Sequence, residues 1–408
     1  MTGSLAHRAE TLRLARVLGV EPAELDFLAA APVEALAELR ATVLDRLLDR
    51  SRQEFERAVA LGDKVPRGLA ATLAQRAMGP VLGGRAAALI SADMAADLAA
   101  RLPAEFLADV AAHVDLRHVG PLIGGIPLDT MAAAGRVLRE REEWIVLAAF
   151  VGDVPEEKLE VLLTGFDAEA LLRAGFVIDD VTRLDTAIAL LPDARLDELF
   201  AVAHQHALWP EAMSLACHIG AEQAGRIVAA VDRQPDDYLD ALLVAAHEHG
   251  LWREAITVAA HLPEASGGAI LRAIERLAPE RLDELLAGAH EHALWPQVIR
   301  VTVRAAGDGS GSGGTVIGAG LGRLTAAQLD DLTAAADAEG LWAEVVTLAV
   351  RLGEDGGEPL ITAIERLDSA QQERLAAILN ERGELRAAAG ALIARAPAHL
   401  QHLVQIPS

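Results

Sequence analysis

Apolar residues recur along this chain at the spacing of an amphipathic helix. Within the segment LDELLAGAHEHALW, the residues Leu282, Leu285, Leu286 and Ala289 stand at positions i, i+3, i+4 and i+7, which places them on one face of a helix. Aromatic residues make up only 3% of the chain although hydrophobic residues make up 52%. Because that apolar mass is mainly Ala, Leu and Val, it favours helix over sheet. The pattern predicts an all-α protein.

The helical pattern repeats with a period of about 43 residues. Four tryptophans lie 43, 43 and 47 residues apart, at Trp209, Trp252, Trp295 and Trp342. A Leu-Asp pair precedes each of them at a constant distance, beginning at Leu196, Leu239, Leu282 and Leu329, and a degenerate fifth copy spans Gln372 to Leu385. One such unit cannot bury its own apolar face, so tandem copies are expected to stack. The sequence predicts a right-handed α-solenoid of about 43-residue helical repeats with an N-terminal helical cap.

Residues that start and stop helices support this division. Thr325 with Gln328, and Ser369 with Gln372, have the spacing of a capping box. Gly250, Gly340 and Gly383 stand where a left-handed residue would end the first helix of a unit. In the less regular upstream part, helices are expected to start at prolines, namely Pro103, Pro127, Pro155 and Pro192.

These patterns divide the chain into three segments. Residues 1–63 are expected to form the N-terminal helical cap, and residues 64–190 a series of irregular short-helix repeats. Residues 191–408 hold the regular repeats and a C-terminal cap.

Two stretches resemble known families. The residues Gly250-Leu251-Trp252-Arg253-Glu254-Ala255 resemble the junction between the two helices of tetratricopeptide-type repeats, while the longer period is closer to armadillo or HEAT repeats. Residues 90–138 are faintly similar to the N-terminal domain of MgtE-type magnesium transporters. These resemblances imply a helical-repeat fold, which serves many binding roles. They imply no magnesium transport, because the channel of that family has no counterpart in the sequence.

Charge and hydropathy narrow the classes of partner. The formal net charge is −24, from 60 acidic and 36 basic residues, so a nucleic-acid backbone would be repelled. Although the mean hydropathy is +0.26, no apolar run reaches the roughly 18 residues that a membrane-spanning helix needs. The single cysteine cannot form an internal disulfide, and the first residues lack a signal-peptide pattern. We expect a cytoplasmic protein without a transmembrane segment.

Histidines recur with the repeat and are candidate ligand-binding residues. The pairs end at His206, His249 and His292, and a second column is formed by His218 and His261. Two histidines at i and i+2 of a helix project about 200° apart, so one pair cannot chelate one metal ion. Equivalent histidines of stacked units could share a metal ion or a ligand carboxylate. The alternative is that they pack and cap helix ends. We expect no metal site and no cofactor.

The tryptophans and two glycines complete the candidate binding residues. The tryptophan column could form an aromatic ladder for a ligand, or it could wedge neighbouring helices apart as buried packing residues. Gly318 and Gly320 replace helix-forming residues of the equivalent helix. Because each glycine costs about 1 kcal/mol of helix stability, this turn is expected to be loose or to let another group approach the backbone.

Three functions are compatible with these features. The leading hypothesis is a non-enzymatic binding module whose groove takes a partner protein or peptide, since no convergent catalytic set occurs. The alternative is a carrier or sequestering protein that holds a hydrophobic small molecule or lipid in the superhelix lumen, which the high apolar fraction favours. A histidine-based metal site or enzyme is the third.

Overall fold

The computed structural model describes residues 5–46, 65–114, 120, 122–151, 153–260, 268–307 and 320–381. Within these ranges every regular element is a helix and none is a strand, so the all-α prediction is confirmed. The chain forms two compact units, Met1–Gly220 and Ala221–Ser408. The division into three segments at residues 63 and 190 stays a prediction.

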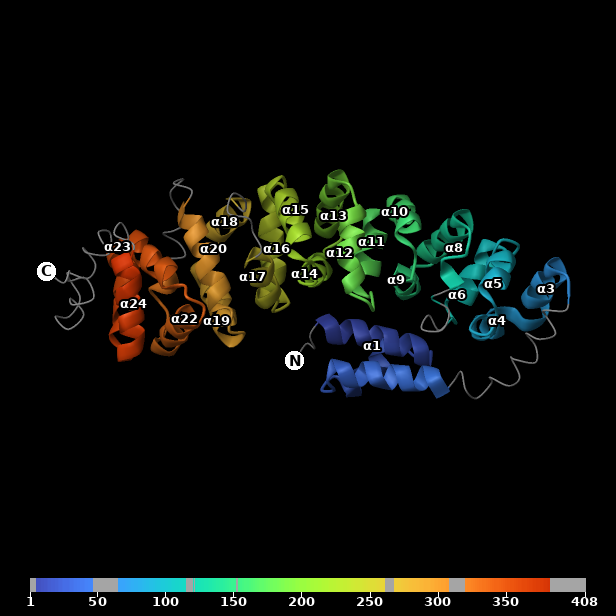
Figure 1. Cartoon of the computed structure of the whole chain (residues 1–408), viewed down its shortest axis with the longest axis horizontal. Coiled ribbons are helices and arrows are strands. Elements are labelled where there is room, and N and C mark those ends of the chain that lie inside the picture. The colour runs from blue at the N-terminus through green and yellow to red at the C-terminus, as the bar shows by residue number, and fades with distance from the viewer. Residues whose placement is uncertain are drawn as a thin grey trace. The chain divides into compact units, whose positions relative to one another are not determined.

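Unit 1 begins with a small helical hairpin. The helix α1 (Leu5–Leu18) and the 3₁₀-helix η1 (Pro22–Leu28) are followed by a helical stretch over residues 33–46, and Figure 1 shows these segments in blue. Leu14, Ala15, Leu25 and Leu36 form a buried cluster inside the hairpin. Residues 5–46, called the N-terminal hairpin below, therefore have a core of their own.

The rest of unit 1 is a succession of short helices. Their bounds are α3 (Arg67–Leu73), the π-helical turn η2 (Ala74–Met78), α4 (Gly79–Ala87), α5 (Ala92–Ala99), α6 (Ala104–Ala111), α8 (Leu128–Glu140), α9 (Trp144–Val151), α10 (Glu156–Gly165), α11 (Ala168–Phe176), α12 (Thr182–Leu190), α13 (Asp193–Gln205) and α14 (Trp209–Ala216). Pro103, Pro127, Pro155 and Pro192 are the N-cap residues of α6, α8, α10 and α13. The predicted proline starts are confirmed, because proline has no amide hydrogen to lose there.

Unit 2 continues with longer helices. They are α15 (Ala221–Asp232), α16 (Asp236–Glu248), α17 (Trp252–Ala260), α18 (Gly268–Glu275), α19 (Pro279–Glu291), α20 (Trp295–Gly307), α22 (Ala326–Ala338), α23 (Trp342–Glu365) and α24 (Ser369–Glu381). The helices that begin at tryptophan, α17, α20 and α23, pack against one another in chain order, and so do α16, α19 and α22. Neighbouring copies of the sequence motif are therefore in direct contact within unit 2.

One helix pair recurs in both units. Its first helix is 13 residues long in α8, α13, α16, α19 and α22, and in each case the next helix begins at a tryptophan. The copy at α8 and α9 begins at Leu128 and includes Trp144. The helix pair is therefore also present upstream of the segment where the sequence motif is regular.

Of the predicted capping boxes and glycine helix ends that lie in described residues, all but one are confirmed. Thr325 and Gln328 form the reciprocal bonds of a capping box, and Gly250 and Gly340 are left-handed, with φ of +65° and +67°. The box predicted at Ser369 and Gln372 is wrong by one residue. The reciprocal bonds join Asp368 and Gln371, because the aspartate carboxylate takes the N-cap role. Gly383 lies outside the described residues.

Candidate ligand-binding cavity

The four repeat tryptophans are buried packing residues. Trp209, Trp252, Trp295 and Trp342 are 3%, 7%, 1% and 1% exposed. Trp209 also lies against Phe200, with ring centroids 6.2 Å apart. Rings this deeply buried offer no face to a ligand from solvent, so their environment favours the wedge interpretation over the aromatic ladder.

The histidines singled out in the sequence are dispersed at helix ends. His206, His249 and His292 are the exposed C-cap residues of α13, α16 and α19. His218 is also exposed, and its Nδ1 lies 2.8 Å from the carbonyl oxygen of Ser214; His261 lies outside the described residues. Over the described part of the chain, no group of three or more His, Cys, Asp or Glu side chains is placed to hold a metal ion.

In two of the pairs, the other histidine contacts the next copy of the helix. In unit 2, His247 forms an ion-pair contact with Glu284 of α19, and His290 Nδ1 lies 3.1 Å from Asp331 Oδ2 of α22. These contacts link successive first helices of unit 2.

The repeated aspartates are held by arginines that the sequence analysis did not select. In unit 2, Asp240 accepts hydrogen bonds from Arg276, Asp283 from Arg323, and Asp330 from Arg366, with shortest distances of 2.7, 2.6 and 2.7 Å. The hydrogen bond with Asp240 raises the pKa of Arg276. Arg276 and Arg366 stand in identical Ala-Ile-Glu-Arg-Leu stretches, which was the available signal. In unit 2 these aspartate–arginine pairs join the first helix of a copy to the residues just before the next one.

The glycine-rich turn has a packing explanation at Gly320. A Cβ at this position would lie 2.8 Å from Leu282 Cδ2 and 3.0 Å from Leu286 Cδ1. The group that approaches the backbone is therefore the apolar face of α19. Gly318 lies outside the described residues.

An apolar cavity of about 250 Å³ lies in unit 1, in a region where the sequence analysis placed no site residue. It extends along helices α4 to α11 and is partly open to solvent. Its lining includes Leu98, Phe106, Val110, Met131, Phe150 and Leu171. Among the lining residues that the structure describes, Thr130 is the only one with a polar side chain, and none carries a charge.

The cavity exists because the helices around it are short and carry small residues. Ala134 and Gly135 of α8 both line it, and Gly135 lets the ring of Phe166 approach, since a Cβ there would lie 2.7 Å from Phe166 Cζ. The helix α9 has the sequence WIVLAAFV and no polar residue. Such a helix must be covered on several sides; Leu147, Phe150 and Val151 line the cavity while Ala148 is buried in a neighbouring cluster. This wholly apolar stretch was the sequence signal for the cavity.

Two titratable groups adjacent in sequence to lining residues, His113 and Asp153, are shifted toward their neutral forms. Burial, with Arg16 and Arg85, lowers the pKa of His113, which precedes the lining residue Val114. Burial also raises the pKa of Asp153, which precedes the lining residue Val154. This part of unit 1 disfavours charge.

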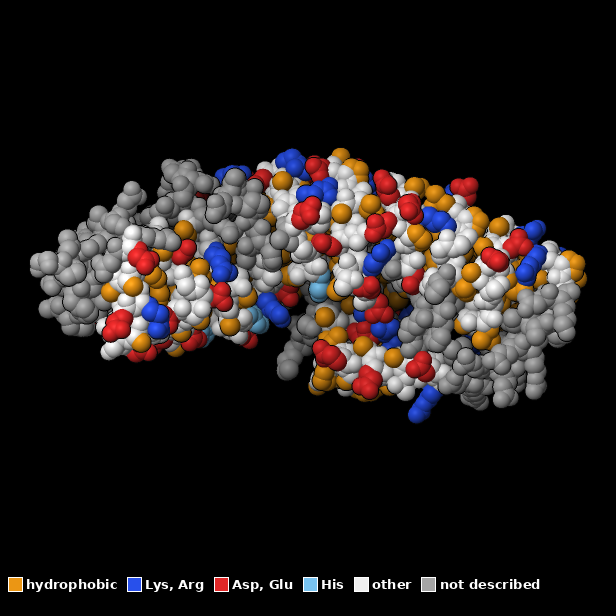
Figure 2. Space-filling model, viewed as in Figure 1, with side chains coloured by type: hydrophobic (Ala, Val, Ile, Leu, Met, Phe, Trp, Pro, Cys, Tyr) orange, Lys and Arg blue, Asp and Glu red, His pale blue; other side chains and the backbone are white. Residues whose placement is uncertain are grey.

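Comparisons with protein-family models, with curated proteins and with solved structures found no match to this chain. The helical-repeat resemblance therefore depends on the residues of the chain itself. None of the described helices is both long and apolar enough to cross a lipid bilayer. Acidic and basic side chains are interspersed over the face drawn in Figure 2.

Proposed function

We propose that this chain is a non-enzymatic, cytoplasmic helical-repeat protein that binds a hydrophobic small molecule or a lipid chain in the cavity of unit 1. In this proposal the 43-residue motif builds an α-solenoid, and the short helices upstream provide the ligand site. The supporting observation is the described lining of the cavity, in which Thr130 is the one polar side chain.

An apolar cavity of this size is energetically costly without a ligand. An apolar space is poorly hydrated, since water needs two to four polar partners. At about 24 cal/mol per Å³, a dry cavity of 250 Å³ costs about 6 kcal/mol, which is comparable with the whole stability of a typical domain. The cavity is partly open, so this value is an upper bound. An apolar ligand offsets this cost.

The lining also specifies the charge of the ligand. None of the described side chains that line the cavity is cationic, and an unpaired carboxylate or phosphate placed among them would lose its hydration without compensation. The ligand is therefore a neutral apolar molecule, or the apolar chain of an amphiphile whose headgroup stays in water.

A protein or peptide partner, the leading hypothesis from the sequence, stays a prediction. A cavity lined by apolar residues on many short helices fits an apolar chain better than a peptide, because a peptide backbone needs hydrogen-bond partners. A stoichiometric protein recovered with the native chain, together with an absence of bound apolar cargo, would favour the peptide hypothesis instead.

The test combines native cargo with a variant that fills the cavity. Organic extraction of the purified native protein and mass spectrometry are expected to release a neutral apolar compound or a lipid. Ala134→Phe places a ring in the cavity and is expected to weaken binding of the neutral fluorophore Nile red by about tenfold. Arg136→Phe adds the same ring to the exposed face of the same helix and is the matched control.

Two results would contradict the proposal. One is an extract without cargo combined with no binding of Nile red or of long-chain alcohols. The other is equal binding by the Ala134→Phe and Arg136→Phe variants, which would place any apolar binding outside this cavity.

A further inference from the structure

The N-terminal hairpin keeps its own core separate from its contacts with the rest of unit 1. Leu14, Ala15, Leu25 and Leu36 are buried against one another inside the hairpin. Ala9 is instead buried in a cluster with residues of α9, α11 and α12, and Leu12 packs against that cluster. Separation of the hairpin from the repeats would expose Ala9 and Leu12 but leave the internal core intact.

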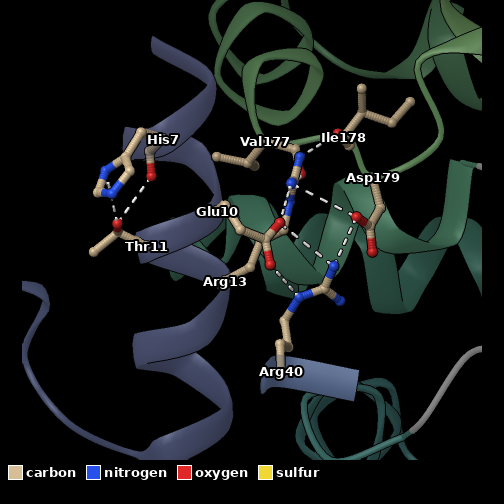
Figure 3. Close-up of polar contacts among 8 residues, drawn as sticks. All are labelled: His7, Glu10, Thr11, Arg13, Arg40, Val177, Ile178 and Asp179. Atoms are coloured by element: carbon tan, nitrogen blue, oxygen red, sulfur yellow. Dashed lines mark hydrogen bonds and ion pairs between the residues drawn. The ribbon is translucent and has the colours of Figure 1, made fainter. Parts of the chain in front are cut away.

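The polar contacts that dock the hairpin run from its arginines to oxygen atoms of the repeats. Arg13 donates to the carbonyl oxygens of Val177 and Ile178, just after α11, and Arg40 donates to Asp179 at 2.9 Å (Figure 3). Two further pairs join Arg16 to Glu143 at 2.9 Å and Arg8 to Glu211 at 3.7 Å. The hairpin thus presents positive charge to a negative face.

The buried carboxylate of this network belongs to the hairpin itself. Glu10 is 2% exposed and accepts from Arg13 at 2.7 Å and from Arg40 at 2.6 Å. Figure 3 shows Glu10 between these two arginines, all three on the hairpin. Undocking therefore leaves Glu10 paired, which avoids the large penalty of an isolated buried charge.

The docked hairpin lies against one end of the cavity wall. Leu147 and Val151 of α9 and Ala174 of α11 pack in the cluster that contains Ala9, and the same three residues line the cavity. The helices α9 and α11 thus have the hairpin on one side and the cavity on the other. Movement of the hairpin removes support from this part of the wall.

We propose that the N-terminal hairpin is a detachable, salt-sensitive lid: docked behind α9 and α11 it holds that part of the cavity wall in place, and once detached it lets the wall open to a ligand. The inference depends on the proposed function, because the cavity is the site that the lid controls. Three of its docking contacts are arginine pairs with partly exposed carboxylates, and such pairs are individually weak and are screened by salt.

The experiment removes the docking charges on the repeat side of the full chain. The variant Glu143→Gln/Asp179→Asn/Glu211→Gln keeps side-chain size and leaves the Glu10 network intact. The matched control is Asp97→Asn/Asp109→Asn/Glu169→Gln, which removes three carboxylates that pair with arginines of the repeats themselves. Hydrogen exchange of α1 and stopped-flow binding of Nile red are measured at low salt and at about 1 M salt, where the Debye length is about 3 Å.

If the hairpin is such a lid, the docking variant should show faster amide exchange in α1 at low salt, by about tenfold. The association and dissociation rates of Nile red should increase by the same factor. The control variant should behave like the wild type, and high salt should bring the wild type toward the docking variant. Faster exchange of α1 without faster binding would overturn the lid, and so would unchanged exchange.

The failure of the lid differs from failure of the proposed function. If the wild type binds Nile red and the docking variant binds it at the same rates, the lid alone is overturned. No binding of any neutral apolar probe overturns the proposed function and the lid with it.

Discussion

Two positions before each repeat tryptophan, the backbone passes through the left-handed region. The φ angles are +53° at Ala207, +65° at Gly250, +54° at Ala293 and +67° at Gly340, and Glu142 has +58° before Trp144. Glycine is favoured in this conformation, whereas a residue with a Cβ is strained. The alanines therefore store strain at a turn that the glycine copies make without it.

Replacing these alanines with glycine should stabilise the protein. Ala207→Gly and Ala293→Gly each relieve strain of about 1–2 kcal/mol. Part of this is offset because glycine adds entropy to the unfolded chain, which leaves a net gain in stability of about 0.5–1 kcal/mol. The midpoint of urea unfolding should rise for both variants and fall for the reverse change Gly250→Ala. A lower midpoint for both glycine variants would contradict the strain.

Asp337 carries a second residue-scale effect, which depends on pH. Its pKa is lowered from 3.8 to about 2, mainly by the hydrogen bond from Arg374 and also by Trp342. A depressed carboxyl pKa gives stability that is fully present above the unfolded value and is lost as pH falls through the folded value. The loss is therefore expected between about pH 4 and pH 2.

Asp337→Asn should abolish this part of the pH dependence. Wild type should be more resistant to urea than the variant at pH 6, and the difference should shrink steadily as the pH is lowered from 4 to 2. Urea titrations at fixed pH values measure it. A difference that stays constant over this interval would mean that the carboxylate has no such role.

Among the elements, helix starts and stops were readable from the sequence because they depend on neighbouring residues alone. Proline N-caps and left-handed glycine C-caps satisfy or remove the unpaired groups of a helix end wherever the helix lies. The capping box at Ser369 failed because Asp368, one residue earlier, offers a better acceptor. Local rules thus set the elements to within a residue.

At Gly320 the residue type is set by packing against a neighbouring helix, α19. In isolation a helical Gly→Ala change stabilises by about 1 kcal/mol, but the Cβ of alanine would lie 2.8 Å from Leu282 Cδ2. Gly320→Ala is therefore expected to destabilise unit 2 by about 1–3 kcal/mol through overpacking.

The control for this prediction is Gly68→Ala in α3, where a Cβ would meet nothing within 4 Å. Chemical unfolding followed by circular dichroism compares the two variants with the wild type. Equal or greater stability of Gly320→Ala would show that α19 can shift to accommodate the methyl group.

At the scale of the whole molecule, ligand binding should act on one compact unit. An apolar ligand in the cavity of unit 1 stabilises that unit by mass action, by about 2.7 kcal/mol at 100 times its dissociation constant. Hydrogen exchange with and without Nile red is expected to slow in helices α4 to α11. Exchange in α16 to α24 of unit 2 should not change, and slowing confined to unit 2 would contradict the assignment.

By itself the sequence determined the helical class, the recurring motif and several helix starts and ends. These features follow from residue spacing, capping chemistry and propensity, which act over a few turns of chain. It also indicated which residues recur, including the tryptophans and aspartates, but left two interpretations open for the tryptophans and none for the aspartates. Burial of the tryptophans and the arginine partners of the aspartates required the packed structure.

Only the tertiary structure decided where an apolar surface is left without a partner. The cavity of unit 1 brings together residues from α4 to α11, and the hairpin contacts connect α1 with α9, α11 and α14. Spacing along the chain tells which residues are apolar on one face, but not which faces meet, because packing joins residues far apart in sequence.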